Sequence, residues 1–149
     1  MPKQSSTTFD ETAMKVEHIQ GFEKNVPSWQ SILDNFNQCV LNTNDIKHQP
    51  LGFFVSHNSD TIPEVKRTMN RLEMKFAHTY MNITLHGGTF GRHNDTMDVW
   101  YWQVQGVTQW EFDDVSYILQ PGDLVTIPMG VYHNVIPLTP RAGISMSIE

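Results

Sequence analysis

Hydrophobic and polar positions repeat with a helical period in the first half of the chain. Beyond Pro27 and Ser28, apolar residues recur at intervals of three and four, at Trp29, Ile32, Leu33, Phe36 and Val40. This spacing places them on one face of a helix, which we expect to end near Asn42.

A second helical stripe follows after a polar stretch. Its apolar members are Val65, Met69 and Leu72. Thr61 and Glu64 have the spacing of a capping box, and Pro63 suits the first turn because its missing N–H has no helical partner there. The pattern therefore predicts a second helix that begins close to Pro63.

The second half of the chain alternates with a period of two, which is typical of strands. Turns rich in Gly, Pro and Asp divide it into short segments, and we expect strands at 98–105, 108–113, 115–119, 124–127, 131–137 and 144–148. The first two should form a hairpin around Gly106. An apolar run at 51–56 and weak alternation at 15–20 predict two more strands, so the fold class is mainly β, closed or double-sheeted.

The strand before this region has two unlike faces. One face is apolar, and the other carries uncharged hydrogen-bonding side chains, at His78, Tyr80, Asn82, Thr84 and His86. Such a face fits the wall of a barrel around a polar ligand, although polar faces of antiparallel sheets more often meet water. On the strand at 98–105, Trp100 and Trp102 should point outward, where the two helices would cover them.

Charge and composition narrow the function classes. The net charge is −6 and the pI is about 5.5, which argues against binding nucleic acid. Cys39 is the single cysteine, so no intramolecular disulfide forms, and no stretch approaches the roughly 18 apolar residues of a membrane span. We expect a cytoplasmic protein with a mobile tail at residues 1–14. A single domain should follow at 15–149, with helical cover and edge strands at 15–76 and a barrel with its site at 77–149.

The candidate chemistry lies in the second half. His93 and Asp95 are alternate residues, so in an extended segment both side chains reach the same side. His133 follows a turn at Pro128 and Gly130 that would return a strand beside them. Two His and one carboxylate form the ligand set of non-haem Fe(II) oxygenases, so we expect these three residues to bind a metal and act as catalytic residues.

The residues around this site resemble the cupin motifs. Gly122, Pro128, Gly130 and His133 match the pattern G-x5-P-x-G-x2-H with every spacing kept. The first cupin motif is kept in part, at Gly87, His93 and Gly106, with Asp95 in place of the second His and Val99 in place of the Glu. These departures, together with Gln103, Gly106 and Trp110, are similar to JmjC-like cupin hydroxylases. The resemblance covers about residues 80–149.

The resemblance implies a fold, an activity and cofactors. The fold would be a double-stranded β-helix, the cupin or jelly-roll barrel, with the two N-terminal helices packed on the outside. The activity would be that of an Fe(II)- and 2-oxoglutarate-dependent oxygenase, a hydroxylase. Thr108 stands where these enzymes place the lysine that binds 2-oxoglutarate, so groups other than a lysine ammonium must hold that carboxylate. The candidates are Tyr101, Thr108, Arg141, Ser145, Asn82 and Thr84.

Arg141 has two alternative interpretations, as a carboxylate-binding residue or as an exposed turn residue. It lies shortly after His133, where other branches of the 2-oxoglutarate oxygenases have a basic residue, and its guanidinium could hold a carboxylate through two hydrogen bonds. Its setting between Pro140 and Gly143 is equally typical of an exposed turn residue.

Two other function classes stay open at this point. One is a metal-dependent cupin without 2-oxoglutarate, acting as a dioxygenase, isomerase or lyase. The other is a cupin module that only binds a small ligand. For the enzyme, the substrate is a small molecule or an exposed peptide side chain, and the chain could form a homodimer.

Overall fold

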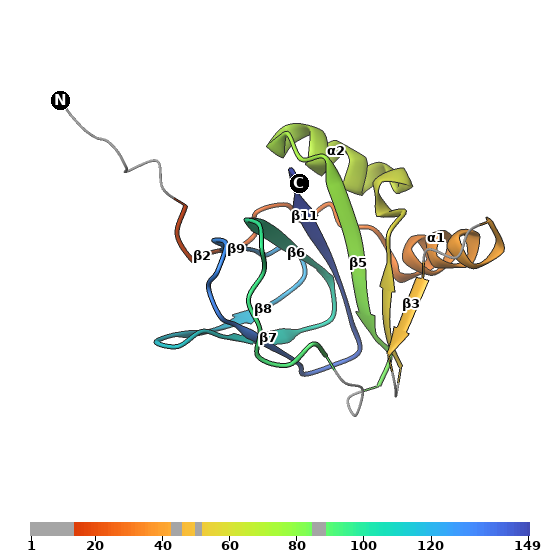
Figure 1. Ribbon diagram of the computed structural model, residues 1–149. Helices are drawn as coiled ribbons and strands as arrows, with labels where there is room; N and C mark the ends of the chain where they lie inside the picture. The colour runs from red at the N-terminus through yellow and green to blue at the C-terminus, as the bar shows by residue number, and fades with distance from the viewer. Residues whose placement is uncertain (1–13, 43–45, 50–51, 85–88) are drawn as a thin grey trace.

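The computed structural model describes residues 14–42, 46–49, 52–84 and 89–149. Apart from Met14, the predicted tail lies outside these residues. The described chain forms two antiparallel sheets (Figure 1). The larger sheet has seven strands, in the order β2 (Glu17–Ile19), β9 (Leu124–Ile127), β6 (Val99–Gln105), β11 (Arg141–Ser147), β5 (Phe76–Asn82), β4 (Phe53–Ser56) and β3 (Ile46–Gln49). The smaller has three, in the order β10 (Asn134–Pro137), β7 (Thr108–Glu111) and β8 (Ser116–Leu119).

The two predicted helices are present, as α1 (Trp29–Asn42) and α2 (Pro63–Leu72). The predicted capping box is wrong, because Ile62 precedes α2 and makes no side-chain cap. The Thr61 hydroxyl instead donates to the carbonyl of Asn58 within a short 3-10 turn, η2 (Ser59–Thr61), and accepts a hydrogen bond from Asn35. Pro63 occupies the start of α2, as expected. Within the described residues, neither helix is long and apolar enough to cross a membrane.

The predicted hairpin around Gly106 is also wrong. β6 pairs with β9 and β11, whereas β7 pairs with β8 and β10 in the other sheet. Gly106 has a φ of 73° and lies against the backbone of Pro140, where a Cβ would overlap the carbonyl oxygen. Beside it, the Val107 N–H donates to Thr139 Oγ1 at 2.9 Å. These contacts direct the chain from one sheet to the other, so Gly106 forms a corner of the barrel.

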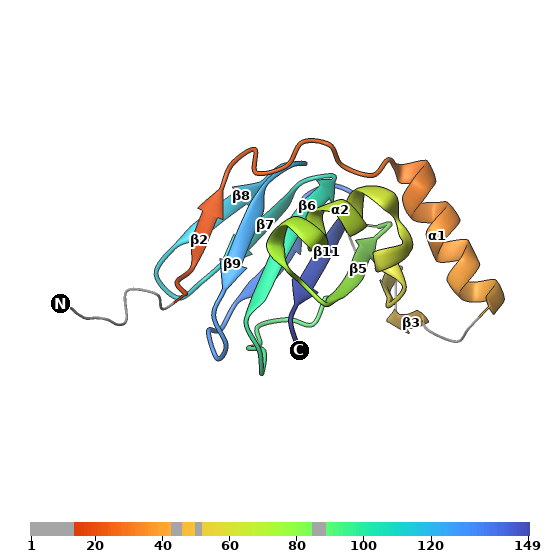
Figure 2. The same ribbon diagram turned by 90° about the horizontal axis from the view of Figure 1, so that it is seen from above.

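The helices cover the outer face of the large sheet, as predicted (Figure 2). One apolar cluster joins Ile32 of α1 and Val65 of α2 to Trp102, which is 0% exposed, and Trp100 packs against it half-buried. Val104, Ile144 and Met146 continue this layer across β6 and β11.

The inner face of the large sheet packs against the small sheet. A second apolar cluster joins Val99, Tyr101 and Val125 of the large sheet to Trp110 and Leu119 of the small one. Two antiparallel sheets packed in this way, with the helices outside, form the jelly-roll barrel that the sequence predicted. The space between the sheets holds the candidate site.

Candidate metal centre

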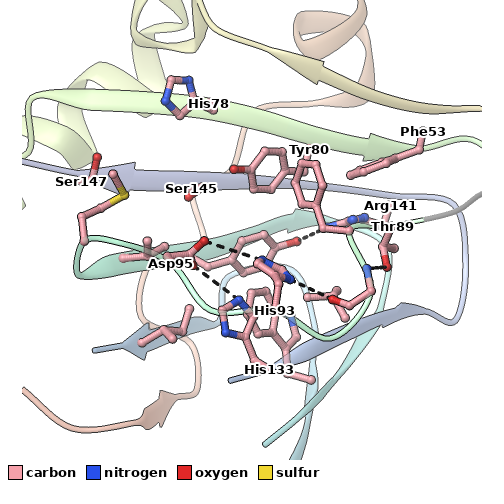
Figure 3. Close-up of a pocket in the computed structure, with 18 of the residues that line it drawn as sticks. Phe53, His78, Tyr80, Thr89, His93, Asp95, His133, Arg141, Ser145 and Ser147 are labelled. Atoms are coloured by element: carbon pink, nitrogen blue, oxygen red, sulfur yellow. Dashed lines mark hydrogen bonds and ion pairs between the residues drawn. The ribbon is translucent and has the colours of Figure 1, made fainter. Parts of the chain in front are cut away.

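His93, Asp95 and His133 converge at one point between the two sheets (Figure 3). One ligand atom from each residue lies within 4.8 Å of the others. His93 Nε2 is 3.6 Å from Asp95 Oδ1, and His133 Nε2 is 3.5 Å from Asp95 Oδ2. Two nitrogens and one carboxylate at this spacing can hold a single divalent ion, with positions left for further ligands.

Loops rather than strands hold these ligands. The predicted extended segment at His93 is reduced to a single bridge, in which His93 and His133 exchange backbone hydrogen bonds of 2.9 and 2.8 Å. The Gly130 N–H donates to the carbonyl of Asp95, and the Met129 N–H donates to Asp98 Oδ1. These bonds fix the two loops against each other, so the ligands are preorganised.

The tautomers of both histidines suit metal binding. His93 Nδ1 lies 2.8 Å from the carbonyl of Gly91, and His133 Nδ1 lies 2.9 Å from that of Val131. A carbonyl only accepts, so both Nδ1 atoms carry the hydrogen and both Nε2 atoms present a lone pair toward Asp95. Burial is the main reason that the pKa of His133 lies below its ordinary value, and the His93 charge adds to it, while the hydrogen bond to Val131 and the Asp95 charge oppose it; the balance favours the neutral ring. The residues therefore fit Fe(II), and equally Mn(II) or Zn(II).

A cavity of about 100 Å³ adjoins the metal ligands and reaches Arg141. Arg141 is 2% exposed and begins β11. Its Nε donates to Asn82 Oδ1 at 2.8 Å, and its Nη1 donates to the Tyr101 hydroxyl at 3.0 Å. The guanidinium also lies 5.7 Å from the centre of the Phe53 ring. Because its side chain is buried, Arg141 is not the exposed turn residue that was one of its two interpretations.

Further hydrogen bonds behind Arg141 fix its position. The Tyr101 hydroxyl donates to Gln103 Oε1, which also accepts from the Thr108 hydroxyl, both at 2.9 Å. Burial raises the pKa of Tyr101 although the Arg141 charge opposes it, so the phenol keeps its proton for this bond. Gly143 makes room for the ring, because a Cβ there would overlap the Tyr101 hydroxyl.

Three of the six candidate cosubstrate residues line the cavity, namely Tyr101, Arg141 and Ser145. Asn82 and Thr108 are buried and reach the cavity only through Arg141 and Gln103. Thr84 is exposed beyond the end of β5 and is not among the lining residues. Hydrogen bonds thus join Asn82, Arg141, Tyr101 and Thr108 in one network, and Ser145 lines the same cavity.

Several lining residues were not selected from the sequence as site residues. Tyr80 faces the cavity from β5, as its alternation indicated, and Phe53 and Phe90 add apolar walls. Trp110 stacks on the His133 ring at a centroid distance of 5.4 Å and an angle of 20°. Trp110 belonged to the matched motif, but the sequence did not reveal which ring it covers.

Three further histidines contact neighbouring side chains. His18 lies 2.9 Å from Asp123, and only 10% of its side chain is exposed. His78 lines the cavity, which was one of two readings for it, and it contacts His57. His86 and the side chain of His48 lie outside the described residues.

Comparison with known proteins shows the fold. No family model and no curated protein matches the sequence. A solved structure of YcfD, a ribosomal oxygenase from Escherichia coli in complex with cobalt and 2-oxoglutarate, aligns with a TM-score of 0.71 at 14% identity. The alignment covers 89% of this chain and 47% of YcfD, so this chain spans about half the length of that protein.

A second similar structure is that of KdgF from Halomonas sp. It aligns with a TM-score of 0.52 at 20% identity, over 68% of this chain and 84% of KdgF. At these identities the likeness concerns the fold alone. The architecture of this chain is that of the cupin-type jelly roll.

Proposed function

We propose that this protein is an Fe(II)- and 2-oxoglutarate-dependent oxygenase that hydroxylates a small molecule or an exposed peptide side chain. The observation that carries the proposal is the presence of a buried arginine in the same cavity as a His-Asp-His ligand set. The likeness in fold to an oxygenase determined with cobalt and 2-oxoglutarate supports it.

The charge of Arg141 is the strongest argument for an anionic ligand. Among the described residues, no carboxylate lies within ion-pair distance of its guanidinium, and the side chains that accept its hydrogen bonds, Asn82 and Tyr101, are neutral. A buried cation without a counter-ion is costly, so the cavity favours a ligand that brings a negative charge. The planar guanidinium can hold a carboxylate through two parallel bonds, which replaces the lysine missing at Thr108.

The remaining residues have distinct roles in this proposal. His93, Asp95 and His133 would hold the metal, which together with 2-oxoglutarate and O2 supplies the oxidising chemistry. Arg141 binds the far carboxylate of 2-oxoglutarate, and Tyr101 and Asn82 orient Arg141. Ser145 adds a hydroxyl to the cavity farther along β11, opposite His78. Phe53 and Phe90 exclude water from the bound acid.

Anaerobic titration with Fe(II) and then 2-oxoglutarate tests the proposal. We expect the visible absorption band of the Fe(II)-2-oxoglutarate complex to develop with one equivalent of each. In Arg141→Met the affinity for 2-oxoglutarate should fall by about 100-fold, since a charge-assisted, bidentate contact is lost. Arg71→Met is the matched control, because Arg71 lies on α2 and is about half exposed.

A metal-dependent cupin without 2-oxoglutarate is the second candidate. It is favoured by the absence of a lysine at position 108, where the Thr108 hydroxyl donates to Gln103. Arg141 is then the one Lys or Arg among the residues that line the cavity. If 2-oxoglutarate gives no absorption band at millimolar concentration, Fe(II) binding with retained affinity would favour this candidate. If neither the absorption band nor Fe(II) binding is observed, the remaining candidate is a ligand-binding module.

A further inference from the structure

His78 and His57 form a pair at the edge of the cavity, apart from the metal ligands. Their Nδ1 atoms lie 2.8 Å apart, and the two rings meet edge to face with centroids at 4.5 Å and an angle of 79°. His78 belongs to β5 and lines the cavity, whereas His57 follows β4. The proposed chemistry assigns neither residue a role.

The position of His78 defines a second end of the cavity. On β5, His78, Tyr80 and Asn82 alternate along one face, and Asn82 holds Arg141 at one end of that row. At the rise of a β-strand, His78 lies roughly 13 Å from Asn82 along the strand. His78 pairs in register with Ser145, and Asn82 with Arg141. Figure 3 shows His78 toward the left and Arg141 toward the right, with the metal ligands below them.

The short contact between the rings determines what His78 offers to a ligand. A hydrogen bond between two nitrogens needs one N–H and one lone pair, so two neutral rings must be opposite tautomers. The Nε2 atom is then an N–H on one ring and a lone pair on the other. If the shared proton moves to the other Nδ1 atom while solvent takes the proton from one Nε2 atom and supplies one to the other, both rings stay neutral and the two Nε2 atoms exchange these roles. His78 can therefore donate to a ligand or accept from it, as the ligand requires.

The Nε2 atom of His78 is available for such a ligand. In the described part of the chain, the one hydrogen bond of either ring is the bond between them. Neither His57 nor His78 takes part in an ion pair there. Burial is the main reason that the pKa of His78 lies below its ordinary value, and His57 adds to the effect while Asp60 opposes it. The ring is thus a neutral hydrogen-bonding group.

The surroundings indicate the chemistry of the ligand. Near His78 the wall consists of Ser145 and Ser147, which are neutral, while Asp95 and Glu149 are the acidic residues that line the cavity. Arg141, at the other end, is the basic residue among the lining side chains. This end therefore disfavours a second anion. A neutral group that both donates and accepts, such as a carboxamide or a hydroxyl, matches it best.

We propose that His78, oriented by His57, binds a carboxamide or hydroxyl group of the substrate at the end of the cavity opposite Arg141. The identification of this molecule as the one oxidised rests on the proposed function. The binding site itself does not, because it consists of His78, His57 and the adjacent serines. His57 is a positioning residue, since it acts through the Nδ1 atom of His78.

Nitrogen NMR of the histidines tests the site without measuring activity. The Zn(II)-loaded protein with ¹⁵N-labelled histidine is titrated with acetamide, and in parallel with sodium acetate as an anionic probe. We expect opposite tautomers for His57 and His78 before titration, and a shift of the His78 Nε2 resonance with acetamide. Acetate should leave that resonance in place. A response to acetate alone, or to neither probe, would overturn the proposal.

Substitutions separate the roles of the two rings. His57→Phe removes the partner of His78, and we expect acetamide binding to weaken by roughly three- to tenfold, the effect of one neutral hydrogen bond. His57→Asn retains a polar partner for Nδ1 and should restore most of the affinity. If His57→Phe and His57→Asn bind acetamide as the wild type does, His57 has no positioning role.

A second measurement distinguishes this proposal from the proposed function. His78→Leu should abolish acetamide binding, measured by calorimetry because the His78 resonance is absent, while Zn(II) still binds with one equivalent per chain. Acetamide binding in a protein that gives no absorption band with Fe(II) and 2-oxoglutarate would refute the oxygenase but keep the carboxamide site. The reverse result, a normal band without acetamide binding, would refute the site alone.

Discussion

The outer and inner faces of the seven-stranded sheet are built from alternate residues of the same strands, yet their interactions differ in kind. On β6, Trp102 and Val104 face the helices in an apolar cluster, while Tyr101 and Gln103 face inward and are held by hydrogen bonds. All four side chains are fully buried. The outer face gains its stability from apolar area removed from water. The inner face has an apolar cluster of its own, but it also holds a charged group away from water, which costs stability.

Because strand parity separates the two faces, they can be disrupted independently. The largest effect is expected from replacing both metal-ligating histidines, in His93→Ala with His133→Ala. Stoichiometric binding of Fe(II), Mn(II) or Zn(II) should be lost, while the far-ultraviolet circular dichroism spectrum stays that of a folded β protein. The reason is that the outer apolar cluster contains neither residue. Tight metal binding by the double variant would disprove the ligand assignment.

The outer face is tested by Trp102→Ala. We expect a loss of about 3–5 kcal/mol in the free energy of unfolding, measured by urea denaturation, as for other fully buried aromatic residues. Trp102→Phe should cost less and serves as a second variant if the alanine variant does not fold. The affinity of the folded Trp102→Phe protein for metal should match the wild type. A loss below about 1 kcal/mol in Trp102→Ala would show that the helices do not depend on this contact.

Gly143 and Ala142 are neighbours that point to opposite faces. Gly143→Ala places a methyl group against the Tyr101 hydroxyl, so the ring must move away from Arg141. We expect a cost of about 1–3 kcal/mol in the free energy of unfolding and weaker binding of 2-oxoglutarate. Ala142→Gly is the matched control, because it changes the outer apolar cluster and should leave 2-oxoglutarate affinity unchanged. Equal affinity in both variants would contradict the role of Gly143.

The smallest effect on stability is expected from Arg141→Met. Removing a buried cation relieves its desolvation, but Tyr101 and Asn82 lose their partner, so the free energy of unfolding should stay within about 1 kcal/mol of the wild type. A loss of several kcal/mol would mean that Arg141 is a structural residue whose charge is satisfied without a ligand. Thermal and urea denaturation in the absence of carboxylic acids would measure it.

The sequence predicted more of the inner face than of the connections between strands. Alternation along 98–105 predicted that Trp100 and Trp102 point outward beneath the helices, and this is confirmed. The ligand set His93, Asp95 and His133 does converge. The prediction of a hairpin at Gly106 was wrong. A glycine between two alternating segments gives the same sequence pattern whether the chain turns back within one sheet or crosses to the other sheet.

By itself, then, the sequence determined which residues share a face and which residue types meet at the metal centre. These properties depend on local periodicity and on the spacing of a few glycines and prolines. Both can be recognised within a short segment of the sequence. Only the tertiary structure decided that Arg141 is buried beside Tyr101 and Asn82, and that His57 meets His78. Those contacts join strands that are distant in the sequence. Strand partners are set by packing of the whole sheet, and no single segment encodes them.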